Sequence, residues 1–118
     1  MSTRKLLQDV NLSQIAFPRG TSEVVLSFLN MVDGAPVGSL VCRGLLAFVY
    51  HNLPDEALPQ YIGEVTLGRI DSAEAWRLLE QAGYQLEPAA EPRGLLYKVS
   101  IEGGITIDIV CHEAELLP

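Results

Sequence analysis

Two stretches near the end of the chain alternate between apolar and polar residues, and they constrain the fold more than any other feature. Leu95, Tyr97, Val99 and Ile101 recur at every second position, and the same spacing returns at 105–111. A period of two is typical of a strand that buries one face and exposes the other. The pattern therefore predicts an antiparallel hairpin.

The register of this hairpin follows from the requirement that both apolar sets share a face. A three-residue turn at 102–104 satisfies it, with Gly104 as the left-handed residue that such turns need. Ile101 then lies opposite Ile105, and Lys98 lies opposite Asp108 as a cross-strand ion pair on the outer face.

Earlier segments rich in β-branched and aromatic residues predict three more strands, at 21–31, 39–51 and 61–67. Asp33-Gly34 marks a turn between the first two. Within the second of them, Leu46 and Phe48 share one parity and are expected on one face. Gly44 lies in the same segment, where a glycine indicates a bulge or a tight bend.

One helix is predicted after the third of these strands. Asp71 is placed to cap its first turn, with Glu74 three residues later, and Gly83 is placed to end it. We expect Trp76 to be a core anchor. The predicted apolar stripe consists of Ala75, Trp76, Leu79 and Ala82.

These elements predict the α+β class: an antiparallel sheet of five to six strands with one main helix packed on one face. Residues 1–118 are expected to form a single domain, and 48% of them are hydrophobic, enough for one core. Residues 6–17 fit either a strand or a short helix, and 87–93, with two prolines, fit a loop. The edge of an open sheet is a surface on which a second copy can pair.

Charge is distributed unevenly along the chain. The net charge is −7, and the acids gather after residue 54. An acidic surface repels nucleic acid and attracts basic proteins or cationic ligands. The longest apolar run, 45–50, is too short to cross a membrane, and no signal-peptide pattern opens the chain. We therefore expect a cytoplasmic protein that binds neither nucleic acid nor membrane and keeps its two thiols reduced.

Catalytic and metal sites are not predicted. Cys111 and His112 are a nucleophile and a base by residue type, but neighbours on a strand face apart, so Cys111 is expected in the core. Cys42 and His51 are separated in the same way unless Gly44 resets the faces. No cysteine or histidine stands at zinc-ligand spacing, and no glycine-rich phosphate loop or cofactor motif is present.

The pattern that remains is suited to protein contact. Aromatic tips and acids gather around the turn near residue 55, and more acids follow. Interfaces favour aromatic residues, and acids complement a basic partner. The candidate partner-binding residues are Tyr50, Asp55, Glu56, Tyr61, Glu64, Glu80, Glu87 and Glu91.

Three segments resemble small bacterial immunity-type proteins that neutralise toxins of the contact-dependent inhibition class. They are 59–65 after a hydrophobic hairpin, Ile101-Glu102-Gly103-Gly104, and the strand 107–111. The resemblance implies a non-enzymatic protein that occupies the active site of a basic toxin domain.

Three hypotheses follow. The first is a non-enzymatic immunity protein with a basic protein partner. The second is a small-ligand-binding or regulatory domain that acts as a homodimer. The third is an enzyme that uses Cys42 or Cys111 as a nucleophile, which iodoacetamide labelling would test.

Overall fold

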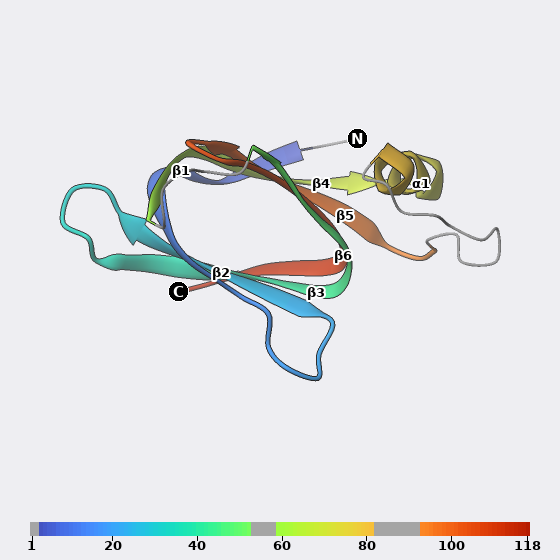
Figure 1. Cartoon of the computed structure of the whole chain (residues 1–118), viewed down its shortest axis with the longest axis horizontal. Helices are drawn as coiled ribbons and strands as arrows, with labels where there is room; N and C mark the ends of the chain where they lie inside the picture. The colour runs from blue at the N-terminus through green and yellow to red at the C-terminus, as the bar shows by residue number, and fades with distance from the viewer. Residues whose placement is uncertain (1–2, 53–58, 82–92) are drawn as a thin grey trace.

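The computed structural model describes residues 3–52, 59–81 and 93–118 (Figure 1). Six strands and one short helix make up this part of the chain. Their bounds are β1 Thr3–Ala16, β2 Glu23–Asn30, β3 Pro36–Asn52, β4 Gln60–Ile70, α1 Ser72–Gln81, β5 Leu96–Gly103 and β6 Thr106–Leu117.

The six strands close into one antiparallel barrel in the order β1-β2-β3-β6-β5-β4. Pairing of β1 with β4 completes the ring, for example between Val10 and Ile62. The antiparallel sheet of six strands with one helix confirms the coarse prediction. The sheet is not open, however, so the edge expected to receive a second copy is paired within the barrel. The segment at 6–17, for which strand and helix both remained open, is part of β1.

The main core fills the barrel. Its members are inward-facing apolar residues from all six strands, as alternation along each strand requires. They are Val10, Leu12, Val24, Leu26, Phe28, Leu40, Cys42, Ile62, Val65, Leu67, Val99, Ile101, Ile105, Ile107, Ile109 and Cys111.

A second, smaller core lies between α1 and the outer surface of the barrel. Ala75 and Leu79 of the helix pack there with Ala47 of β3 and Val110 of β6. Asp71 caps the helix as predicted, because its Oδ1 accepts a hydrogen bond from the backbone N–H of Glu74 at 2.7 Å.

Trp76 differs from its prediction as a core anchor. It is half-buried and belongs to neither core, and its indole N–H donates to the carboxylate of Glu80 one turn later. The stripe that packs is formed by Ala75 and Leu79, with Leu78 beside them. Ala82 and Gly83 lie outside the described residues.

The final hairpin has the predicted faces but a register shifted by two residues. Ile101 pairs with Ile107, Val99 pairs with Ile109, and Ser100 instead of Lys98 faces Asp108. Ile105 lies in the turn with its side chain buried.

Gly104 is not left-handed, and the prediction that it supplies such a residue is wrong. The reason lies in β4, which pairs with β5 and continues that pairing beyond the expected end of the strand. Gly103 continues β5 as the partner of Ile62, and the Gly104 N–H donates to the Tyr61 carbonyl at 2.7 Å. These contacts extend β5 past Glu102.

The bulge predicted at Gly44 is present. Gly44 has φ +64°, and the pairing of β3 with β6 shifts between Leu45 and Ala47. Phe48 contacts the barrel core, whereas Leu46 packs with the α1 core. The bulge thus places apolar side chains of β3 on both sides of the sheet, whereas the sequence predicted one face for Leu46 and Phe48.

Candidate functional site

The barrel is hollowed at the end where β1 begins and β6 ends. Here the first residues of β1 pair only with β4, because pairing of β1 with β2 starts at Val10. On the opposite wall, the last residues of β6 pair with β3, as Ala114 does with Cys42. A cavity of about 370 Å³ lies between these walls, and we call it the mouth. Its lining residues are Arg4, Lys5, Leu6, Leu67, Ala114, Glu115 and Leu116.

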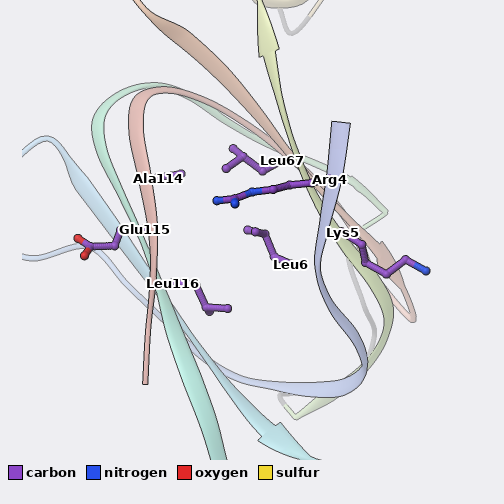
Figure 2. Close-up of a pocket in the computed structure, with 7 residues that line it drawn as sticks. All are labelled: Arg4, Lys5, Leu6, Leu67, Ala114, Glu115 and Leu116. Carbon is purple, nitrogen blue, oxygen red and sulfur yellow. The ribbon is translucent and has the colours of Figure 1, made fainter. Parts of the chain in front are cut away.

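The side chains of the mouth divide into those that enter it and those that leave it (Figure 2). Arg4 directs its guanidinium group between Leu6 and Leu67 toward the opposite wall. Glu115 and Lys5 point away. Glu115 instead meets Arg43 on the outer surface, at 3.0 Å, and Lys5 donates to Gln8 at 3.3 Å. The mouth therefore combines apolar walls with one cationic group.

A second hollow of about 200 Å³ adjoins the mouth and shares Arg4 and Leu67 with it. Arg69 of β4 and Tyr97 of β5 line this hollow, and the two residues are direct cross-strand partners. Within the described residues the ion pairs all belong to Arg43, and neither Arg4 nor Arg69 is paired with an acid.

The two thiols lie close to these hollows but are covered. Cys42 is the cross-strand partner of Ala114, and Cys111 is the partner of Tyr97. Both cysteines are free of any disulfide and fully buried, and burial was predicted for Cys111. A hydrogen bond to Cys111, together with burial, raises the pKa of the Cys42 thiol. The same bond, with Cys42 as donor, lowers the pKa of Cys111.

His112 and Cys111 lie in different surroundings, since Cys111 belongs to the main core and His112 is exposed. Its imidazole is exposed, and Nδ1 lies 2.9 Å from the carbonyl oxygen of Leu95. Across the part of the chain that the structure describes, no three His, Cys, Asp or Glu residues gather in a way that would hold a metal ion. The same residues include no helix long and apolar enough to span a membrane.

The predicted partner-binding residues are only partly described. Tyr61 and Glu64 lie at the start of β4 on its outer side, whereas Glu80 lies on α1, beyond the far end of β4. At about 3.3 Å per strand residue, β4 separates them by tens of ångströms, so the three do not form one patch. Tyr50 is in β3, paired with Ile107. Asp55, Glu56, Glu87 and Glu91 lie outside the described residues.

The outer side of β4 does gather a smaller acidic group around Tyr61. The Tyr61 hydroxyl donates to Asp9 Oδ1 at 2.7 Å, and this bond raises the pKa of Tyr61. Asp9 has φ 51°, an uncommon conformation for a residue with a side chain. Glu64 pairs across the sheet with Glu102.

The chain is thus a small closed antiparallel barrel with a pocket at one end, and the Arg4 guanidinium is the polar group that enters this pocket. Residues 5–117 match a protein-family model described as "-like:-like", and the chain belongs to this family. A crystal structure of an uncharacterized protein from Neisseria gonorrhoeae is similar over 100% of this chain and 99% of that one, with a TM-score of 0.70 and 20% identity. That likeness shows a shared fold. No curated protein matches the chain.

Sequence reasoning missed the mouth. Neither Arg4 nor Leu116 is among the candidate residues predicted from the sequence. The available signal was the spacing of Arg4 and Leu6, which puts a cation and an apolar residue on one face of a strand. That signal has meaning only once β1 is known to be a barrel wall.

Proposed function

We propose that the protein is a non-enzymatic binding protein that holds a small molecule in the mouth of its barrel. The observation that carries this proposal is the Arg4 guanidinium, directed into a cavity lined by Leu6, Leu67 and Leu116. Ligand pockets are typically concave and mostly apolar, with a few placed polar groups, and barrel mouths are a common location. The cavity lies at the small end of the usual range of volumes.

Filling the mouth tests this proposal. Ala114→Phe adds a ring at the wall opposite Arg4, while Val32→Phe adds the same ring at an exposed hairpin tip, where Val32 is 95% exposed. Small-molecule fragments would be screened by ¹H–¹⁵N NMR for shifts at Leu6, Leu67 and Leu116. We expect Ala114→Phe to weaken the hits by about tenfold or more and Val32→Phe to leave them unchanged. Fragments that bind both variants equally, or that shift other regions, would refute a mouth site.

We also propose a second candidate, binding of a basic protein partner, as an immunity protein would. The acids near Tyr61 support it: Asp9 accepts a hydrogen bond from this side chain, which is 43% exposed, and the cross-strand pair Glu64 and Glu102 follows along β4. Aromatic residues bordered by acids are suited to a cationic surface.

Charge reversal separates this candidate from the first. Glu64→Lys with Glu102→Lys would be used as bait in a salt-eluted pull-down, with Glu80→Lys on α1 as the control of equal charge per site. A basic protein retained by the native chain and by Glu80→Lys, but lost by the double variant, is the expected result. Equal retention by all three baits would remove the acidic group from consideration.

The homodimer of the ligand-binding hypothesis is tested separately, by sedimentation at several protein concentrations.

A further inference from the structure

Two arginines border the hollowed end of a chain that has 15 acids and only 8 lysines and arginines. Arg43, on the outer surface, lies within 4 Å of carboxylates from Glu23, Glu113 and Glu115. Arg4 and Arg69 instead line one shared hollow, where the described residues offer no acid to either. Two like charges facing one space favour an anion between them.

The walls determine what kind of anion fits. Leu6, Leu67 and Leu116 present hydrocarbon to the mouth, and the main core lies beneath them. An inorganic ion would leave these walls in contact with water, whereas a hydrocarbon body would cover them and gain affinity from the apolar surface removed from water. Tyr97 adds a phenol at the arginine end.

The chemistry of the guanidinium group narrows the head further. Its planar fork matches a carboxylate through two parallel hydrogen bonds, and such charge-assisted bonds are stronger than neutral ones. Arg69 and Arg4 both line the adjoining hollow, so a head group held there has both arginines at its walls while the body extends into the mouth.

We propose that the mouth binds a small carboxylate with an aliphatic body, its head between Arg4 and Arg69 and its body against Leu6, Leu67 and Leu116. This inference rests on the proposed ligand-binding function and assigns the class of ligand. The head group carries the specificity, and the hydrocarbon contributes affinity.

The test compares probes that differ only in the head group: octanoate, octanol and octyl phosphate. Each would be titrated into the native chain and into Arg4→Met, Arg69→Met and Arg77→Met, with binding followed by ¹H–¹⁵N NMR. Methionine keeps most of the apolar stem and removes the charge. Arg77 is exposed on α1 and lines neither hollow, so it provides the matched control.

We expect octanoate to bind at least about tenfold more tightly than octanol. Arg4→Met should reduce octanoate to the affinity of octanol, Arg69→Met should weaken it partly, and Arg77→Met should change nothing. Octanoate and octanol binding equally, with no effect of Arg4→Met, would overturn the carboxylate assignment and leave the pocket in place. Tighter binding of octyl phosphate would also overturn it, in favour of a phosphate head. If no probe binds, and the fragment hits bind the native chain and Ala114→Phe with equal affinity, the proposed function itself is refuted.

Discussion

Gly103 shows how one missing side chain fixes the approach of two strands. A Cβ placed there would lie 2.3 Å from the Tyr61 carbonyl oxygen and 2.6 Å from Ile62 Cα, both backbone atoms of β4. Neither atom can retreat without separating β4 from β5. The glycine is therefore required by the close approach, while its own φ is not left-handed.

We predict that Gly103→Ala destabilises the protein by about 3 kcal/mol or more, as overpacking against an immobile backbone does. Gly34→Ala is the matched control, because its φ of +72° is strained for alanine but nothing lies within 4 Å of the added Cβ. That control should cost about 1–2 kcal/mol. Urea denaturation measures both, and equal midpoints would contradict the account of Gly103.

The Tyr61–Asp9 bond gives the protein an alkaline pH dependence. Hydrogen bonding to Asp9 and partial burial raise the pKa of Tyr61. A group whose pKa is higher in the folded state stabilises the fold below its unfolded value, near 10 for tyrosine, and this contribution is lost as pH rises through the folded value. The native chain should therefore be more stable than Tyr61→Phe below about pH 10 and lose this difference in stability at higher pH.

Thermal unfolding of both chains across this pH range is the measurement. Asp9→Asn is the control, since asparagine keeps an acceptor and tolerates the left-handed φ but carries no charge. It should show a weaker pH dependence. A constant difference between the native chain and Tyr61→Phe would mean that the bond does not form in solution.

At the scale of elements, α1 depends on its first turn. The helix is short, and isolated helices of this length are marginal, so its cap and its packing against Ala47 and Val110 must hold it. We expect Asp71→Ala to lower stability by about 1 kcal/mol and Asp71→Asn to have little effect, since both native and asparagine caps accept the N–H of Glu74. Chemical denaturation measures both variants. Equal losses would show that the charge, and not the hydrogen bond, matters.

The elements could be predicted from sequence because they depend on local pattern. The strands at 21–31, 39–51 and 61–67 correspond to β2, β3 and β4, and Asp71 caps the helix. The hairpin register could not be fixed this way. A shift of two residues keeps every side chain on its face, so face agreement alone cannot distinguish Ile101 opposite Ile105 from the observed partner Ile107.

At the scale of the whole molecule, closure of the barrel could not be predicted from the sequence. It depends on pairing between β1 and β4, whose alternation fits an open sheet equally well. The mouth exists only because of closure, so Arg4, Arg69 and Leu116 could not be grouped from sequence. The contact between Cys42 and Cys111 could not be predicted either, since it depends on the long-range pairing of β3 with β6.

One ion network links three strands on the outer surface. Arg43 of β3 lies 3.7 Å from Glu23 of β2 and 3.1 Å from Glu113 of β6, with Glu115 at 3.0 Å. Its removal leaves three acids facing one another. We expect Arg43→Met to lower the melting temperature at low salt and to approach the native value at about 1 M salt, where the screening length is about 3 Å. Arg77→Met is the control with the same charge change, and equal effects at all salt concentrations would contradict a network.

The enclosed thiols report on opening of the barrel. Cys42 and Cys111 are fully buried, so iodoacetamide can reach them only when strands separate. We expect labelling of the native chain to be slow and to accelerate with urea in step with global unfolding. Mass spectrometry would locate the modified residue. Rapid labelling of either thiol in native buffer would instead support the nucleophile hypothesis.

Pairing between distant strands also sets when the barrel can form during synthesis. Arg4 can pair only after Leu67 has been synthesised, and Ser39 only after Leu117. Each of these pairings must close a long loop, and the entropic cost of closure comes before any stabilising contact. Among small domains, topologies with such long-range pairings fold slowest, in milliseconds to seconds. On the ribosome, β1 therefore lacks one neighbour until β4 has been made, and β3 lacks one neighbour until β6 emerges. During that interval the apolar face of β3 is exposed to chaperones and to other chains.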